Sequence, residues 1–289
     1  MSKNNSLNLV LLIFILVLVI IVVYEPGKKE AVTPPTLTNL QSNNIYSIKI
    51  NRHSATADEQ LIEFEKKSDG WVMLKPYSIS ANTFRIDSIL KLLSAVSLSQ
   101  NDLKNLNPKT FGLDKPAVTI TFNNNLSIVF GHNKSLKNHR YIRVSSTLHM
   151  VADTFLYQLA AKAESYISHK LINTKSKLVK LTLPSMKLEK ITSTWQVTPK
   201  ADNFSADSAN QLINEWQLSQ AFDVNKVNPA PKNKPDIVMQ LENNKNLRFK
   251  IENSKENFNL INIDAGMRYI LSSGRKDKLL KLSNITQDN

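Results

Sequence analysis

Alternating apolar and polar residues predict two β-hairpins of the same design. The first joins Val118–Phe122 to Leu126–Phe130 through a short asparagine turn, and the second joins Ile237–Leu241 to Leu247–Ile251. In each arm every second residue is apolar, which is the pattern of a strand with one buried face. Both hairpins should therefore cover a core with one of their two faces.

A helical pattern precedes each hairpin, and the two helices are related by a repeat. The segment Phe84–Gln100 matches Phe204–Gln220 at a constant offset of 120 residues. We expect the first helix to begin near Asn82 and Ser205 to be the N-cap of the second. Apolar residues at i, i+3, i+4 and i+7 predict one buried face in each helix. They are Ile89, Leu92, Leu93 and Val96 in the first copy and Ala209, Leu212, Ile213 and Trp216 in the second.

Shorter strands complete each copy, with three before the helix, two after the hairpin, and a closing helix from Asp153 or from about Ser273. The strands are predicted at 45–50, 60–66, 71–75, 141–144 and 148–151, and at 178–183, 186–191, 194–197, 258–263 and 267–271. This order predicts an α+β fold of two tandem repeats, each a mainly antiparallel sheet with helices on one face. The similar tripeptides Arg140-Tyr141-Ile142 and Arg268-Tyr269-Ile270 fall on different strands, so we interpret their likeness as chance.

An apolar run near the N-terminus predicts a transmembrane helix. Apart from Asn8, residues 7–24 are all apolar or aromatic, and these 18 residues would form a helix about 27 Å long, just enough to span a bilayer. A cleaved secretory signal is the alternative, but the sequence Val22–Gly27 lacks the small residues of a cleavage site. We therefore favour an uncleaved anchor. Lys3 before the run and Lys28 and Lys29 after it are too evenly balanced to set the orientation.

The predicted organisation has four parts. They are a transmembrane anchor at 1–24, a Pro-containing linker at 25–43, a first α+β repeat at 44–172 and a second at 173–289. Pro26, Pro34 and Pro35 lie among Thr, Asn and Lys in the linker, which predicts an extended, solvated spacer. The remaining length suits two domains of ordinary size.

Composition narrows the functional classes. The net charge is +13 and is spread along the chain, which would draw a tethered body toward anionic lipid headgroups. We do not expect nucleic acid as a partner, because no binding motif accompanies the charge. The chain has no Cys, so disulfides, thiolate metal sites and lipid-anchored cysteine are excluded. With 6 glycines it has neither a P-loop nor a dinucleotide fingerprint.

No motif spells out a reaction, and we predict no catalytic, cofactor-binding or metal site. None of the histidines shows the i, i+4 spacing of a helical zinc site; they are His53, His132, His139, His149 and His169. A Ser-Lys dyad or a carboxylate pair stays open, since either needs only proximity in space. We interpret Asp87 and Asp207 as first-turn acids on their helices, and Trp71, Trp195 and Trp216 as core residues.

Several motifs of the first copy resemble the bacterial domain-of-unknown-function 4340 family. They are Gly70-Trp71 with Pro76, the run Phe111-Gly112-Leu113-Asp114-Lys115-Pro116, Phe130-Gly131, Arg140-Tyr141-Ile142 and Lys170-Leu171. The resemblance covers about 45–172, and the second copy keeps only Lys234-Pro235 of the long run. It implies an N-terminal membrane anchor and a repeated α+β exterior region, often encoded near ABC-type transporters, and it transfers no catalytic residue.

The sequence thus leads to one hypothesis and one alternative. The hypothesis is a single-pass protein of the cell inner membrane, anchored by residues 7–24, whose periplasmic region binds an envelope protein partner as a scaffold and serves as an accessory to an ABC-type transporter. The alternative is an envelope hydrolase acting on cell-wall or polysaccharide substrate. A cleft holding a buried carboxylate or Ser-Lys pair would favour the enzyme, and a basic or apolar patch away from any cleft would favour the binder.

Overall fold

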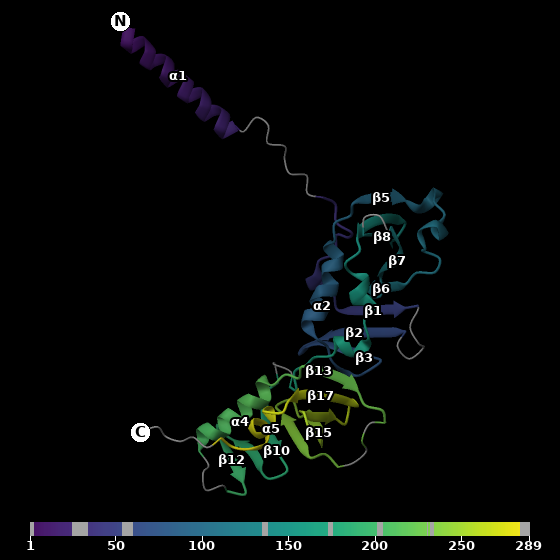
Figure 1. Cartoon of the computed structure of the whole chain (residues 1–289), viewed down its shortest axis with the longest axis vertical. Coiled ribbons are helices and arrows are strands. Elements are labelled where there is room, and N and C mark those ends of the chain that lie inside the picture. Colours follow the sequence, from purple (N-terminus) through teal and green to yellow (C-terminus); the bar gives the residue numbers. More distant parts are fainter. Residues whose placement is uncertain are drawn as a thin grey trace. The chain divides into compact units, whose positions relative to one another are not determined.

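The structure is a computed structural model that describes residues 3–24, 34–53, 60–134, 138–172, 176–200, 205–229, 231 and 234–283. The chain forms two compact units, Met1–Pro35 and Thr36–Asn289, the second of which we call the body (Figure 1). Each unit is described by itself.

The first unit is built on helix α1 (Lys3–Tyr24). Its stretch Leu7–Tyr24 has 18 residues with a mean hydropathy of 3.3, and none of it is buried. A helix of this length and composition can cross a membrane, as predicted. Residues 25–33 of the predicted linker lie outside the described residues.

The first sheet of the body is antiparallel throughout and has the order β4-β3-β2-β1-β6-β7-β8-β9-β5. Its strands are β1 (Ser47–Arg52), β2 (Leu61–Lys67), β3 (Gly70–Lys75), β4 (Ile79–Ser80), β5 (Ser99–Asp102), β6 (Val118–Phe122), β7 (Leu126–Lys134), β8 (His139–Val144) and β9 (Thr147–Ala152). The predicted hairpin is β6 and β7, in which Ile120 lies opposite Ile128 on the buried face.

The second sheet is also antiparallel, in the order β12-β11-β10-β14-β15-β16-β17-β13. Its strands are β10 (Leu178–Thr182), β11 (Lys187–Ile191), β12 (Thr194–Thr198), β13 (Asp223–Lys226), β14 (Ile237–Leu241), β15 (Asn246–Glu252), β16 (Asn257–Asn262) and β17 (Met267–Ser272). With β4 set aside, the two sheets have the same strand order. The predicted α+β class is confirmed, and β4, β5 and β13 are strands that we did not predict.

Helices lie beside each sheet (Figure 1). The first sheet has α2 (Thr83–Leu90) with its 3-10 continuation η3 (Lys91–Ser94), then α3 (Leu156–Leu159) and η6 (Ala163–Tyr166); the second has α4 (Ala206–Leu218) and α5 (Arg275–Leu280). Asn82 caps α2, and Ser205 caps α4 in a reciprocal capping box with Ser208. Both predicted helix starts are confirmed.

The repeat offset of 120 does not align the two helices. Their N-caps, Asn82 and Ser205, are 123 positions apart, so Leu93 and Trp216 hold the same helical position and both are buried. Val96, which we expected on the buried stripe, lies beyond the helix and is 43% exposed. The predicted offset is therefore wrong by three residues, which is close to one helical turn of 3.6 residues. A shift of that size superimposes an apolar stripe on itself, so the pattern could not reveal it.

The segment between the sheets is held by main-chain bonds on both sides. The Ser168 amide donates to the Ser80 carbonyl at 2.9 Å, and farther along the Leu171 amide donates to the Ser219 carbonyl at 3.3 Å. Leu37 makes a similar bond at the start of the body, where its amide donates to the Ala95 carbonyl at 2.8 Å. Ala95 and Ser219 are the residues that follow the two helices. The end of the predicted spacer therefore packs against the first helix.

Candidate functional site

The motif residues of the first sheet come together around two close main-chain approaches. Gly112 ends η5 (Pro108–Phe111) with a φ of +68°, and a Cβ at this position would collide with the His132 ring. A Cβ on Gly131 would collide with the Phe111 carbonyl. Both glycines are thus required for the Phe111–Leu113 turn to lie against Phe130–His132.

A small apolar cluster under this turn lies on the sheet face opposite the main core. Leu113, Val129 and Leu148 are buried in it, and Phe111 packs edge-on against Tyr141 with ring centres 5.0 Å apart. The Phe-Gly-Leu run of the motif therefore covers the outer side of β7, β8 and β9. The aromatic and leucine side chains of the run point into the protein, so the run serves the fold.

Arg140 and Asp153 form a nearly buried ion pair beside the same turn. Arg140 donates from Nε and Nη2 to the two Asp153 carboxylate oxygens at 2.7 and 2.8 Å, and from Nη1 to the Gly131 carbonyl at 2.5 Å. Asn133 donates to the same carboxylate at 2.6 Å. The hydrogen bond from Arg140 holds the pKa of Asp153 below its ordinary value. All three guanidinium nitrogens and both carboxylate oxygens bond to protein groups, so the pair is a structural clasp.

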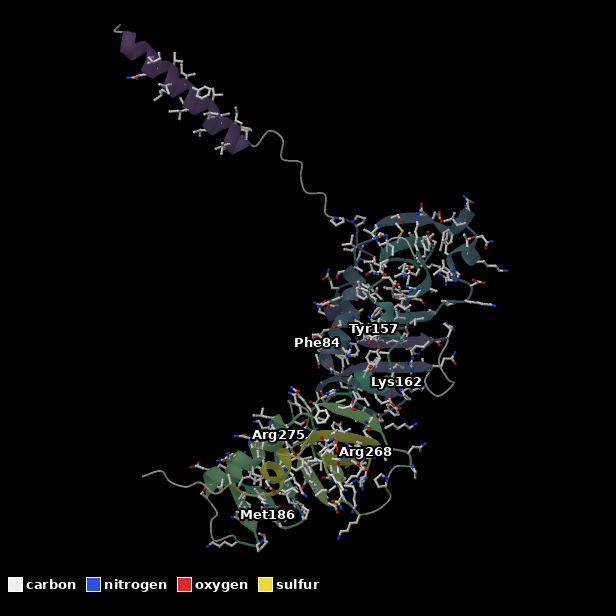
Figure 2. The ribbon with its side chains drawn as sticks, viewed as in Figure 1. Phe84, Tyr157, Lys162, Met186, Arg268 and Arg275 are labelled. Carbon is white, nitrogen blue, oxygen red and sulfur yellow. The ribbon has the colours of Figure 1, made fainter. Side chains whose placement is uncertain are left out.

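The second Arg-Tyr-Ile tripeptide has a different environment. Arg268, labelled in Figure 2, donates to the Glu252 carboxylate at 2.7 and 2.6 Å on the outer face of β17. This bond is the main cause of the lowered pKa of Glu252. Tyr269 points into the core, whereas Tyr141 points out of it. The two tripeptides therefore lie on different strands with opposite faces buried, as expected for a chance likeness.

Ser97 and His149 form a serine–histidine pair. The Ser97 hydroxyl and His149 Nδ1 are 2.9 Å apart, and Ser97 also donates to the Ser99 carbonyl at 3.0 Å. Both side chains are buried, and burial lowers the pKa of His149. Because Ser97 lies just before β5 and His149 lies on the neighbouring strand β9, this buried pair helps to hold β5 on the sheet.

The other histidines are dispersed. His132 packs on Gly112, His139 begins β8, His53 lies 3.4 Å from the Thr119 hydroxyl, and His169 lies 3.1 Å from the Ala221 carbonyl. Within the described residues, no group of three or more His, Asp or Glu side chains could hold a metal ion. Residues 135–137, in the loop between His132 and His139, lie outside that description.

The predicted core tryptophans are confirmed, and one of the two acids is misplaced. Trp71, Trp195 and Trp216 are buried, and Trp216 Nε1 donates to the Leu279 carbonyl at 2.8 Å. Asp207 lies in the first turn of α4, as expected. Asp87 is the fifth residue of α2 and not a first-turn acid. The offset of 120 from the start of α4 at Ala206 would begin the first helix at residue 86, but α2 begins at Thr83, three residues earlier.

Two open grooves lie along exposed sides of α2 and α4. The first, of about 610 Å³, runs between Thr36–Ser42 and the end of α2, and includes Asp87 and Lys91. The second, of about 440 Å³, includes Asp207 and Glu215. Glu215 is bound to Arg275 at 2.5 Å, and eight helical residues separate the two acids by about 12 Å along the axis, more than the roughly 5–9.5 Å between glycosidase carboxylates. Neither groove thus presents the acid pair of the hydrolase alternative.

Two aromatic side chains stand out into solvent on the helical side of the first sheet. Phe84 on α2 is 74% exposed and Tyr157 on α3 is 86% exposed (Figure 2). Tyr166 connects α2 and α3. Its carbonyl accepts from the amide of Asn82, the N-cap of α2, at 2.7 Å, and its hydroxyl donates to the carbonyl of Gln158 in α3. Burial raises the pKa of Tyr166, so this phenol stays a neutral donor. Phe84 precedes the buried Ile86 by two residues, so its place on the outer side of the helix could have been found from the sequence.

Comparison with known proteins gave a single kind of match. The sequence profile of one family, described as Domain of unknown function (DUF4340), matches residues 71–260. This range extends from the first sheet into β16 of the second, well beyond the 45–172 covered by the motifs. No curated protein and no solved structure matches the chain.

Proposed function

The chain belongs to the DUF4340 family, and we propose that it is a single-pass membrane-anchored scaffold whose body binds another envelope protein. The observation that carries this proposal is the exposure of Phe84 and Tyr157 on adjoining helical supports. Aromatic side chains contribute strongly to protein interfaces because they bury much area with little loss of side-chain freedom. The apolar stretch Leu7–Tyr24 supplies the anchor in this proposal.

The proposal includes the division of the chain. Residues 1–24 are the anchor, 25–43 the linker, whose last part from Thr36 packs on the body, and 44–172 and 173–289 two copies of one module. The common strand order of the two sheets and their capped helices 123 positions apart support the duplication. A duplicated module would give the body two related sets of surfaces.

We further propose that the anchor lies in the cell inner membrane with the body in the periplasm. If this is right, alkaline phosphatase fused to the C-terminus of the full chain will be active, and a reporter that works only in the cytoplasm will be silent. The matched control is the same pair of fusions on a chain that lacks residues 7–24. Activity of the cytoplasmic reporter alone on the full chain would reverse the orientation.

The family resemblance favours a component of an ABC-type transporter as the partner. Such a component would lie in the same membrane, so the anchor would raise its effective concentration near the body. Contact through Phe84 and Tyr157 would then need little affinity of its own.

Photo-crosslinking from single positions tests the surface. A photoreactive phenylalanine analogue placed at Phe84 or Tyr157 in the full chain should give one discrete product with a second protein in intact membranes. The product should persist at roughly 0.3 M salt, where charge attractions are screened beyond several Å.

Tyr46 offers the matched control. It is an exposed aromatic at 56%, but it lies beside the β6–β7 turn, where its amide donates to Asn123 Oδ1. The same analogue at Tyr46 should give no such product. Equal products from all three positions, or none from Phe84 and Tyr157, would reject this surface.

A further inference from the structure

Contacts between the two sheets join one particular side of each. The connection η6 lies beside β4, since the Asn82 amide donates to the Tyr166 carbonyl and Ala81 bridges Ile167. On its other side η6 contacts β13, the edge strand of the second sheet. At this contact Lys226, the last residue of β13, lies over the Tyr77 ring at 5.7 Å.

This arrangement leaves the two opposite edges open. Strand β5 ends the first sheet and β12 ends the second, and no other strand of the described chain pairs with their outer sides. Long uncharged edges are normally protected, since unpaired main-chain groups invite another chain. Yet β12 reads Thr-Trp-Gln-Val-Thr, with no charge along it.

The open edges correspond to strands that lie on the two sides of the internal contact. Strand β5 corresponds to β13, because each begins four residues after the residue that ends the helix, Ala95 or Ser219. Strand β12 corresponds to β3 in the common strand order. The side that β13 presents thus has a counterpart at β5. The side that receives β13 carries β4, η6 and Tyr77 beyond β3, and its counterpart is β12 with Pro199 and Lys200, without a β4.

Charge at the corresponding positions is complementary. Asp102 ends β5 as Lys226 ends β13, and Lys200 follows the proline after β12 as Tyr77 follows the proline after β3. Asp102 and Lys200 are both exposed. Where the internal contact pairs a lysine with an aromatic ring, the corresponding external contact would pair a carboxylate with an ammonium group.

We propose that copies of this chain associate head to tail, with the β5 edge of one copy against the β12 edge of the next. The occupant of each open edge is then a second copy, and the contact resembles the one already made between the two sheets, without β4 and η6 between the edges. An interface of this heterologous kind does not close on itself in a dimer, so it generates linear arrays or rings.

Engineered cysteines test this in the full chain in its own membrane, because the natural sequence has no Cys. One population carries Asn101→Cys and the other Thr198→Cys, with different affinity tags; both residues are exposed and leave Asp102 and Lys200 intact. With a short bis-maleimide, the mixed 101–198 product should exceed both same-site products. The control pairs Thr198→Cys with Glu256→Cys, an exposed site between β15 and β16, and should stay at background.

Exchanging the charges at Asp102 and Lys200 distinguishes a specific contact from random collisions between crowded copies in the membrane. Asp102→Lys or Lys200→Asp alone should lower the mixed product roughly two- to fivefold, the range of an exposed ion pair, and mixing the two exchanged variants should restore it. Asp102→Asn keeps the cap on the Lys104 amide and should lower the yield without altering the melting temperature. Mixed yields no higher than the control, no restoration, or Asn101→Cys products with another protein instead would overturn the proposal.

Discussion

Replacing Arg140 with methionine is expected to lower the free energy of unfolding of the body by about 3–5 kcal/mol. The substitution removes three hydrogen bonds and leaves the Asp153 carboxylate and the Gly131 carbonyl without their main partner in a nearly buried place. Urea unfolding of Arg140→Met followed by circular dichroism measures the loss. Because the turn at Gly112 rests on the same strands, near-ultraviolet signals from Phe111 and Tyr141 should change as well.

The double variant Arg140→Met with Asp153→Leu is the control for this clasp. It removes both charges, so most of the lost stability should return. The lowered pKa of Asp153 gives a second check, because the pair stabilises the fold above the ordinary carboxyl pKa of about 4 and loses that effect as pH falls through the folded pKa. The wild type and the double variant should therefore converge in stability in acid. A single variant as stable as the wild type at pH 7 would contradict this account.

Sequence periodicity located nearly all of the strands that carry a buried face. Strands such as β6 and β14 alternate strictly and bury every second side chain, so their pattern records their environment. Strands β5 and β13 gave no such signal, because they are edge strands and Val224 is the only buried residue in either. Their positions are set by pairing with β9 and β17, which a local pattern does not contain.

The functional surface was harder to predict than the fold for a related reason. The motif residues Phe111, Gly112 and Arg140 stand out in the sequence, but their strong constraints come from close packing and a buried ion pair. Phe84 and Tyr157 are largely exposed, and although the helical pattern places Phe84 on the outer side of α2, only the structure shows that Tyr166 connects the elements that carry them. A residue that contacts an external partner does not contribute to the apolar periodicity by which core residues are recognised in a sequence.

Replacing Trp216 with alanine is the second large effect that we expect, at about 3–5 kcal/mol of the free energy of unfolding. Trp216 is fully buried at the position on α4 that Leu93 holds on the first helix, and its indole ties α4 to the Leu279 carbonyl of α5. The alanine leaves a large cavity and an unpaired carbonyl. Trp216→Phe keeps most of the apolar volume and should cost roughly 1–3 kcal/mol, chiefly through the lost hydrogen bond and a smaller cavity.

Leu218→Ala on the same helix is the matched control, because Leu218 is exposed and should change stability by no more than about 0.5 kcal/mol. Thermal unfolding of the three variants should rank the losses as alanine at 216, then phenylalanine at 216, then alanine at 218. If the two sheets unfold in separate steps, only the step of the second sheet should move. A Trp216→Ala variant that melts with the wild type would mean that α4 is not held on the second sheet by this residue.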